Sequence, residues 1–140
     1  MTHLLDTSAI LAHYLGEPGA ETVSELLAGG SEVACLAAPS WAELERRLAE
    51  LIPDPKEAER IWRHYTQSLC GMLSLDQEAA LAAIRIRRRA LQRIPLVDAL
   101  IAGTAAFHGL ILVHRDLHMD SIPAATVKSL RLPDKWQHVG

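Results

Sequence analysis

Apolar residues in this chain occur in short runs of strand length that alternate with longer stretches of helical spacing. Residues 3–5 form the first apolar run and predict a strand. Residues 9–15 have the length and periodicity of a helix, which Thr7 and Ser8 would open. A second short helix is predicted over residues 20–28. The chain therefore begins as strand, turn and helix.

The same alternation continues to the end of the chain. Residues 33–37 are apolar throughout, as expected of a strand that is covered on both faces. The other predicted elements are helices over about 40–51, 56–69, 77–92 and 95–108, with Asp76 capping the third, and strands over 72–75, 110–113 and part of 126–130. The segment after Asp116 is otherwise expected to be irregular. Strands that alternate with helices predict an α/β fold, with a parallel sheet of four or five strands flanked by helices on both faces.

The predicted helix over residues 95–108 holds one acidic side chain, Asp98, in apolar surroundings. Pro95 suits its first position and Gly109 suits the residue after its end. Large apolar residues cover most of its circumference: Leu96, Val97, Leu100, Ile101 and Phe107. A buried carboxylate is costly unless it is paired or binds a metal, and a first-turn position favours its ionised form. The helix is therefore predicted to be buried and to offer Asp98 to a cation.

Length and charge narrow the classes of function. A chain of 140 residues suits one domain, residues 1–140, with a real core. A net charge of −3 gives no general positive field, so any contact with nucleic acid needs local basic residues or metal ions. Cys35 and Cys70 fall in apolar segments and are interpreted as reduced, buried thiols. Asp6 interrupts the first apolar run and no run can span a bilayer, so we expect a soluble, cytoplasmic protein without membrane contact.

Four acids fall where predicted strands and helices meet. Asp6 ends the first strand, Glu43 lies in the first turn of the helix after the second strand, and Asp98 lies in the first turn of the helix before the fourth strand. Asp116 follows that fourth strand by three residues. Ligands of open α/β sheets bind beyond the carboxyl ends of the strands, so all four acids can face one crevice. Crowded carboxylates need a hard cation, for which Mg²⁺ or Mn²⁺ is the natural choice.

Three of these acids also have a structural explanation. Asp6 could cap the helix that follows it, and Asp116 could be an ordinary loop acid. Glu43 stands three residues after Ser40, which is the spacing of a capping box. Asp98 has the weakest explanation of this kind, because its helix is apolar nearly all round.

These residues resemble the PIN-domain nucleases, and among them the VapC toxins of bacterial toxin–antitoxin pairs. The resemblance covers nearly the whole chain. Its four motifs are Leu4-Leu5-Asp6-Thr7-Ser8-Ala9, Ala42-Glu43-Leu44, Pro95-Leu96-Val97-Asp98-Ala99-Leu100-Ile101-Ala102 and Leu112-Val113-His114-Arg115-Asp116-Leu117-His118. The third motif is quite specific, and the others gain weight from their order and spacing. His114 stands where the family commonly has threonine or serine, and Met119 stands where phenylalanine is common.

The resemblance implies a metal-dependent endoribonuclease. Asp6, Asp98 and Asp116 would hold Mg²⁺ or Mn²⁺, with Glu43 as a further ligand or as the base that orients water. A bound metal would lower the pKa of a water and shield the phosphodiester during in-line attack, which leaves a 5′-phosphate and a 3′-hydroxyl. Similar toxins often cleave structured RNA such as tRNA, bind a cognate antitoxin and form homodimers. A homodimer or a toxin–antitoxin hetero-oligomer is therefore expected.

Residues next to the first and fourth acids are candidates for contact with the substrate. Thr7 and Ser8 follow the first acid, and His114 and Arg115 precede the fourth. Arg115 is placed to contact a phosphate or to pair with an acid. His114 and His118 have a spacing that binds zinc on a helix, but their segment is predicted to be a loop without a third nearby ligand.

A basic run precedes Asp98 and allows two interpretations. It consists of Arg85, Arg87, Arg88, Arg89 and Arg93. The arginines could guide phosphates toward Asp98, or they could form an ordinary solvated helix face. The sequence favours the solvated helix face.

The rival reaction is phosphoryl transfer to an aspartate of the protein, which occurs in two other kinds of domain. Phosphatases with a strand-terminal nucleophile have a second aspartate two residues after the first, where this chain has Ser8. Receiver domains have a lysine near the end of the last strand, where His114 and Arg115 stand. Both are disfavoured. A catalytically silent PIN-like domain that only binds RNA or a protein remains the alternative to an enzyme.

Overall fold

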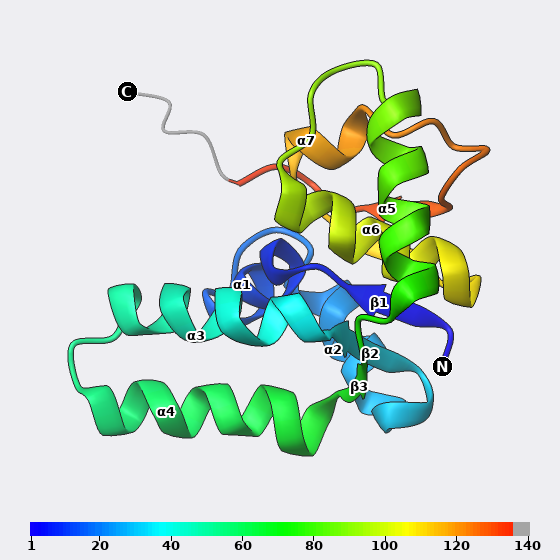
Figure 1. Ribbon diagram of the computed structural model, residues 1–140. Coiled ribbons are helices and arrows are strands. Elements are labelled where there is room, and N and C mark those ends of the chain that lie inside the picture. Colours follow the sequence, from blue (N-terminus) through cyan, green and yellow to red (C-terminus); the bar gives the residue numbers. More distant parts are fainter. Residues whose placement is uncertain (136–140) are drawn as a thin grey trace, which may run out of the picture.

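The structure, a computed structural model, describes residues 1–135 of the chain (Figure 1). Its main elements are β1 (His3–Leu5), α1 (Thr7–Tyr14), α2 (Ala20–Ala28), β2 (Ala34–Ala37), α3 (Ala38–Leu51), α4 (Pro55–Arg63), β3 (Gly71–Leu73), α5 (Gln77–Arg89), α6 (Leu96–His108), β4 (Ile111–His114), α7 (Leu117–Asp120) and β5 (Ser129–Arg131). The five strands form one parallel sheet in the order β3-β2-β1-β4-β5. The predicted α/β fold is confirmed, including the short last strand.

Each strand in the middle of the sheet contributes to two hydrophobic cores. Leu4 of β1 and Leu112 of β4 pack against α5 and α6, whereas the next residues, Leu5 and Val113, pack on the opposite side with α1 to α4. Successive side chains of a strand point to opposite faces, so a strand that is covered on both sides must be apolar at every position. The two helical layers therefore cover the two faces of the sheet, as Figure 1 shows.

Helix α6 lies close to α5 because a glycine faces the contact. A Cβ atom on Gly103 would meet the backbone carbonyl oxygen of Ala79 at 2.6 Å. Gly109 ends the helix in the left-handed conformation, with φ of 67°, as predicted. The expectation that α6 is buried nearly all round is wrong, because Leu96 and Phe107 are about half exposed.

None of the helices within residues 1–135 is long and apolar enough to cross a membrane.

Several elements differ from the prediction. Helix α3 begins at Ala38, directly after β2, because Pro39 is tolerated in a first helical turn. The helix predicted to end at residue 69 becomes π-helical over His64–Leu69. Helix α5 ends at Arg89 rather than near residue 92. The segment after Asp116 is not irregular throughout, since the Asp116 side chain caps the one-turn helix α7.

Candidate metal site

All four predicted acids face one small pocket, although they come from separate parts of the chain. The pocket has a volume of about 180 Å³. Its lining residues are Asp6, Thr7, Ser8, Leu11, Glu43, Arg46, Arg47, Asp98 and Asp116. Asp6 directly follows β1 and Asp116 follows β4, which are neighbouring strands between which the order of connections reverses. This reversal is where ligands bind in open α/β sheets.

Asp6 is held by the start of α1 and keeps one oxygen free. Its Oδ2 atom accepts hydrogen bonds from the backbone N–H of Ser8 at 3.2 Å and from the Ser8 hydroxyl at 2.5 Å. Its Oδ1 atom is buried and has no hydrogen-bond partner within the described part of the chain. A buried carboxylate oxygen without a partner is costly unless a ligand takes that place. Asp6 is thus both the cap of α1 and a candidate metal ligand.

Burial and mutual repulsion raise the pKa values of two acids. Burial raises the pKa of Asp98 to about 7, and the negative charges of Asp116, Asp6 and Glu43 add to this effect. Burial also raises the pKa of Asp6 to about 6, although the hydrogen bonds from Ser8 oppose the rise. Both groups therefore tend to bind protons when no cation is present. A divalent cation would favour the ionised forms instead.

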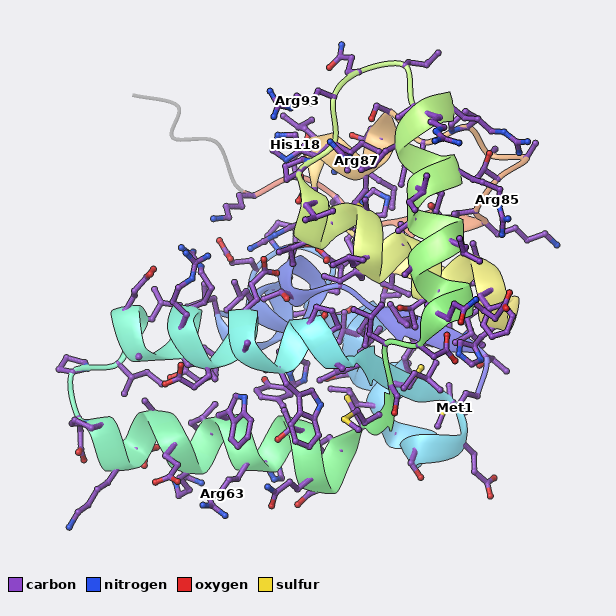
Figure 2. All side chains as sticks on the ribbon, in the orientation of Figure 1. Met1, Arg63, Arg85, Arg87, Arg93 and His118 are labelled. Carbon is purple, nitrogen blue, oxygen red and sulfur yellow. The ribbon has the colours of Figure 1, made fainter. Side chains whose placement is uncertain are left out.

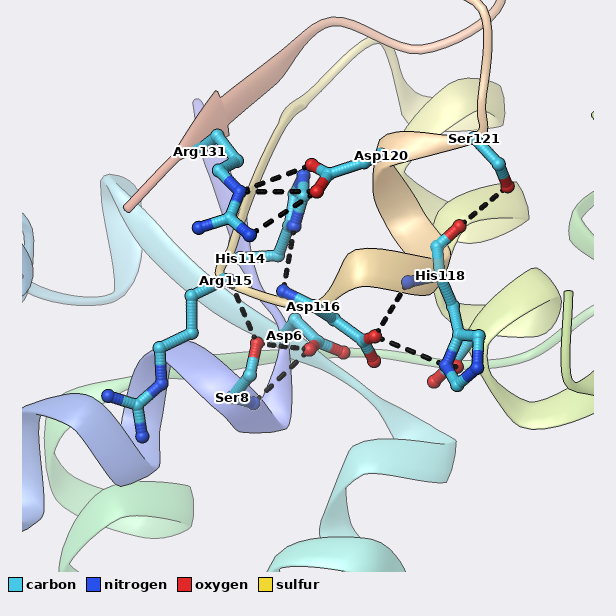
Figure 3. Close-up of polar contacts among 10 residues, drawn as sticks. Asp6, Ser8, His114, Arg115, Asp116, His118, Asp120, Ser121 and Arg131 are labelled. Atoms are coloured by element: carbon cyan, nitrogen blue, oxygen red, sulfur yellow. Dashed lines mark hydrogen bonds and ion pairs between the residues drawn. The ribbon is translucent and has the colours of Figure 1, made fainter. Parts of the chain in front are cut away.

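His118 also lies at this site, a role that was not predicted for it. Its Nδ1 atom lies 3.2 Å from Asp116 Oδ1 and 3.5 Å from Asp98 Oδ2 (Figure 3). One ligand atom from each of these three residues lies within 4.8 Å of the others. Asp6 and Glu43 line the same pocket but do not belong to this tight group. No pattern in the sequence marks this role, because His118 lies in the single turn of α7, which was not predicted.

Glu43 reaches the pocket from the second turn of α3, not from the first turn. The helix starts at Ala38, and Ala37 is its N-cap without a side-chain hydrogen bond. Ser40 lies inside the helix, where its hydroxyl is buried and has no partner in residues 1–135. The capping-box explanation for Glu43 is therefore wrong.

The pocket is also lined by two arginines that were not predicted, Arg46 and Arg47. They lie one turn after Glu43 on α3, and this spacing could have indicated that they face the same pocket.

His114 supports the fourth acid instead of lying at the surface. Only 1% of its surface is exposed, and its Nδ1 atom accepts a hydrogen bond from the backbone N–H of Asp116 at 3.1 Å. Burial lowers the pKa of His114 and so favours its neutral ring. The ring must be neutral for Nδ1 to accept the hydrogen bond from Asp116. The predicted contact of His114 with substrate therefore needs correction, because the ring is under the surface. Among the described residues, the group of possible metal ligands that contains His118 does not include His114.

Of the other three candidates for substrate contact, Ser8 and Arg115 make contacts that support the site, whereas Thr7 only lines the pocket. The Ser8 hydroxyl oxygen accepts a hydrogen bond from the backbone N–H of Arg115 at 3.1 Å. The same hydroxyl donates a hydrogen bond to Asp6. The Arg115 guanidinium is 5% exposed and pairs with Glu17 at 2.6 Å, so Arg115 pairs with an acid and does not present its charge to a phosphate. Thr7 lines the pocket, but it is 3% exposed and its hydroxyl has no partner in the described residues.

These features together fit a hard divalent cation. Several carboxylate oxygens converge in one pocket, one of them is buried without a partner, and two of the acids have raised pKa values. Oxygen donors of this kind match Mg²⁺ and Mn²⁺, and the nearby imidazole is also compatible with Mn²⁺.

Comparisons with known proteins agree on the type of domain. A family model described as PIN domain matches residues 3–125. The structure of FitAcB from Neisseria gonorrhoeae is 29% identical, with a TM-score of 0.71, and the match covers 93% of this chain and 97% of that chain. DNA-bound VapBC from Salmonella typhimurium is 21% identical, with a TM-score of 0.76, and the match covers 94% and 98% of the two chains.

A third structure has the same fold. VapBC-5 from Mycobacterium tuberculosis, a member of the VapBC family of toxin–antitoxin systems, is 19% identical, with a TM-score of 0.69. That match covers 93% of this chain and 98% of the other. A search of curated proteins finds no match. At these identities the Salmonella and Mycobacterium structures show a likeness of fold.

Proposed function

The chain belongs to the PIN-domain family, and from this premise we propose that it is a metal-dependent endoribonuclease, the toxin of a VapBC-type toxin–antitoxin pair. One observation carries the proposal: Asp6, Glu43, Asp98 and Asp116 line the same pocket. Four carboxylates in so small a space repel one another, and burial already raises the pKa values of two of them. An arrangement that is unfavourable for the isolated protein is typical of a site that binds a cation.

The proposed mechanism assigns each acid a task. Asp98 and Asp116 would hold Mg²⁺ or Mn²⁺ together with the free Oδ1 atom of Asp6. The bound ion supplies Lewis-acid chemistry, because it lowers the pKa of a water and screens the charge of the phosphodiester. Glu43 would orient the attacking water and accept its proton. His118 lies beside two of the ligands, where it can donate a hydrogen bond to a leaving oxygen or add a nitrogen ligand.

The surrounding residues would keep these acids in position. Ser8 holds one oxygen of Asp6, and His114 accepts the backbone N–H of Asp116. Such supporting contacts orient the ligands of metal sites. The family's common hydroxyl is absent at position 114, but the His114 ring fixes the backbone of a proposed ligand, which favours an active site over a silent domain.

The proposed partners are an RNA substrate, such as a structured tRNA, and a cognate antitoxin. Support for an antitoxin comes from the likeness to VapBC-5, which belongs to a toxin–antitoxin family. Homodimers, or hetero-oligomers with the antitoxin, are the proposed assemblies. Because RNA is the substrate, the proposed place of action is the cytoplasm.

Incubation of the purified protein with total RNA tests the proposal. Cleavage is expected with Mg²⁺ or Mn²⁺ and not with EDTA, and the products should carry 5′-phosphate and 3′-hydroxyl ends. Asp98→Asn should lose at least about a hundredfold in rate, because it removes a carboxylate that acts in the transition state. Glu25→Gln, at an exposed acid of α2, is the matched control and should cleave normally. Retention of RNA without cleavage in any metal would instead show a silent binding domain.

A further inference from the structure

Helix α5 and the loop that follows it carry a group of arginines that make no ion pair with the described residues. These residues, all exposed, are Arg85, Arg87, Arg88, Arg89 and Arg93, on α5 and on the loop that leads to α6. No ion pair found within residues 1–135 involves any of them. Residues 77–95 carry five arginines and one glutamate, a formal charge of +4, while the whole chain carries −3. The remaining residues therefore carry −7, so positive charge is concentrated in this segment.

Three of the five arginines share one pocket. Arg87, Arg88 and Arg93 line a hollow of about 360 Å³ together with two isoleucines. Figure 2 shows Arg87 and Arg93 on the side of α5 toward His118. Arg93 precedes Asp98 by only five residues, which limits the distance between their Cα atoms to about 18 Å. We call this set of three the arginine pocket.

The other two arginines lie elsewhere. Arg85 and Arg89, one helical turn apart, line a separate hollow of about 180 Å³ beside Phe107. Figure 2 shows Arg85 on the side of α5 away from His118. The chain therefore offers two sets of arginines on α5 and the loop after it, one on the side of α5 toward His118 and one on the opposite side (Figure 2).

We propose that the arginine pocket binds phosphates of the RNA strand that flank the scissile bond. This inference rests on the proposed function. A polyanion must approach a pocket lined by four carboxylates and only two arginines, Arg46 and Arg47, on a protein whose net charge is negative, so further positive charge along its path would offset the repulsion. Guanidinium groups bind phosphate oxygens through paired N–H donors, and phosphate contacts supply most of the non-specific affinity for nucleic acid. Three arginines that line one hollow also repel one another until an anion lies between them.

Two double variants with the same change in net charge test the proposal. Arg87→Gln with Arg93→Gln removes two members of the arginine pocket, and Arg85→Gln with Arg89→Gln is the control. The probe is a fluorescein-labelled single-stranded RNA of mixed sequence, 20 nucleotides long, and its anisotropy is followed from 50 to 200 mM KCl. EDTA is present, so that neither cleavage nor a bound metal contributes.

The first variant should bind the RNA roughly tenfold more weakly at 50 mM KCl, and the slope of log affinity against log salt should fall by about 1.4, or about 0.7 for each lost phosphate contact. The control should change affinity by less than about threefold, since its arginines would feel the RNA only through screened charge. Far-ultraviolet circular dichroism and thermal melting of both variants establish that they are folded.

Several results would overturn the proposal. Equal losses in the two variants would mean that only net charge matters. Unchanged RNA binding by the first variant would exclude the pocket, and a selective loss of binding to poly-L-glutamate would assign it to an acidic protein instead. Cleavage is measured separately with Mg²⁺. If the wild type binds RNA through these arginines but does not cut it, the nuclease proposal fails while the arginine pocket stands. If it cuts RNA and the first variant cuts with unchanged KM, the arginine pocket fails alone.

Discussion

Asp98→Asn is expected to stabilise the metal-free protein above pH 7, although it should abolish cleavage. Burial and the neighbouring carboxylates raise the pKa of Asp98 to about 7 in the folded state, whereas an aspartate in an unfolded chain has a pKa of about 3.9. Between these two values the folded state binds more protons than the unfolded state. The free energy of unfolding must therefore fall as the pH rises from about 4 to about 7.

The size of the effect follows from the pKa difference. A difference of roughly three pH units corresponds to about 4 kcal/mol at pH 8, which asparagine avoids because it carries no charge. The asparagine amide needs hydrogen bonds of its own. Those that it does not make lower the free energy of unfolding of the variant by about 2 kcal/mol. A net gain of about 2 kcal/mol remains, which raises the Tm of a chain of 140 residues by about 7 °C.

Urea unfolding in EDTA at pH 5 and pH 8 measures this effect. The wild type should lose about 3 kcal/mol between the two pH values through Asp98 alone, and the variant should lose only the part that Asp6 contributes. Glu25→Gln, the exposed control, should behave as the wild type does. Addition of Mg²⁺ at pH 8 to a hundred times its Kd should stabilise the wild type by about 2.7 kcal/mol and the Asp98 variant much less.

Two results would refute this reasoning. If Asp98→Asn is no more stable than the wild type at pH 8 in EDTA, the buried carboxylate carries no penalty in the folded state. If the stability of the wild type does not fall between pH 5 and pH 8, the raised pKa values are wrong.

Three further substitutions test how the site and its support are built. Ser8→Ala removes a donor to Asp6, so calorimetry should show a roughly tenfold loss of Mg²⁺ affinity, while an unchanged affinity would deny this hydroxyl a supporting role. Glu17→Gln leaves the Arg115 guanidinium buried without its partner and should lower the free energy of unfolding by about 3 kcal/mol in urea. Gly103→Ala should destabilise by about 2 kcal/mol, because the new methyl would press on the backbone of α5, and a stabilised variant would contradict this close contact.

The sequence located the acids because their positions follow from simple rules. A carboxylate directly after a buried strand, such as Asp6, lies at the edge of the sheet where ligands bind. Asp98 lies in the first turn of α6, as its distance from Pro95 predicted. Neither placement depends on details of packing, so local pattern was sufficient for both.

The supporting roles could not be found in this way, because they depend on contacts between segments far apart in the sequence. His114 is buried because β5 pairs alongside β4, and the Leu132 N–H donates to its carbonyl oxygen. His118 reaches the site only because α7 forms, and one turn is too short to produce a periodic pattern. The exposed position of Phe107 depends on where α5 covers α6. Tertiary packing decides each of these features.

Two of the four acids have a second task, which affects how homologous sequences should be judged. Asp6 caps α1 and Asp116 caps α7, so selection for folding alone can preserve both in a descendant that has lost catalysis. Asp98 and Glu43 make no such contribution to a helix end. Retention of the two caps is therefore no sign of activity, whereas retention of Asp98 and Glu43 is.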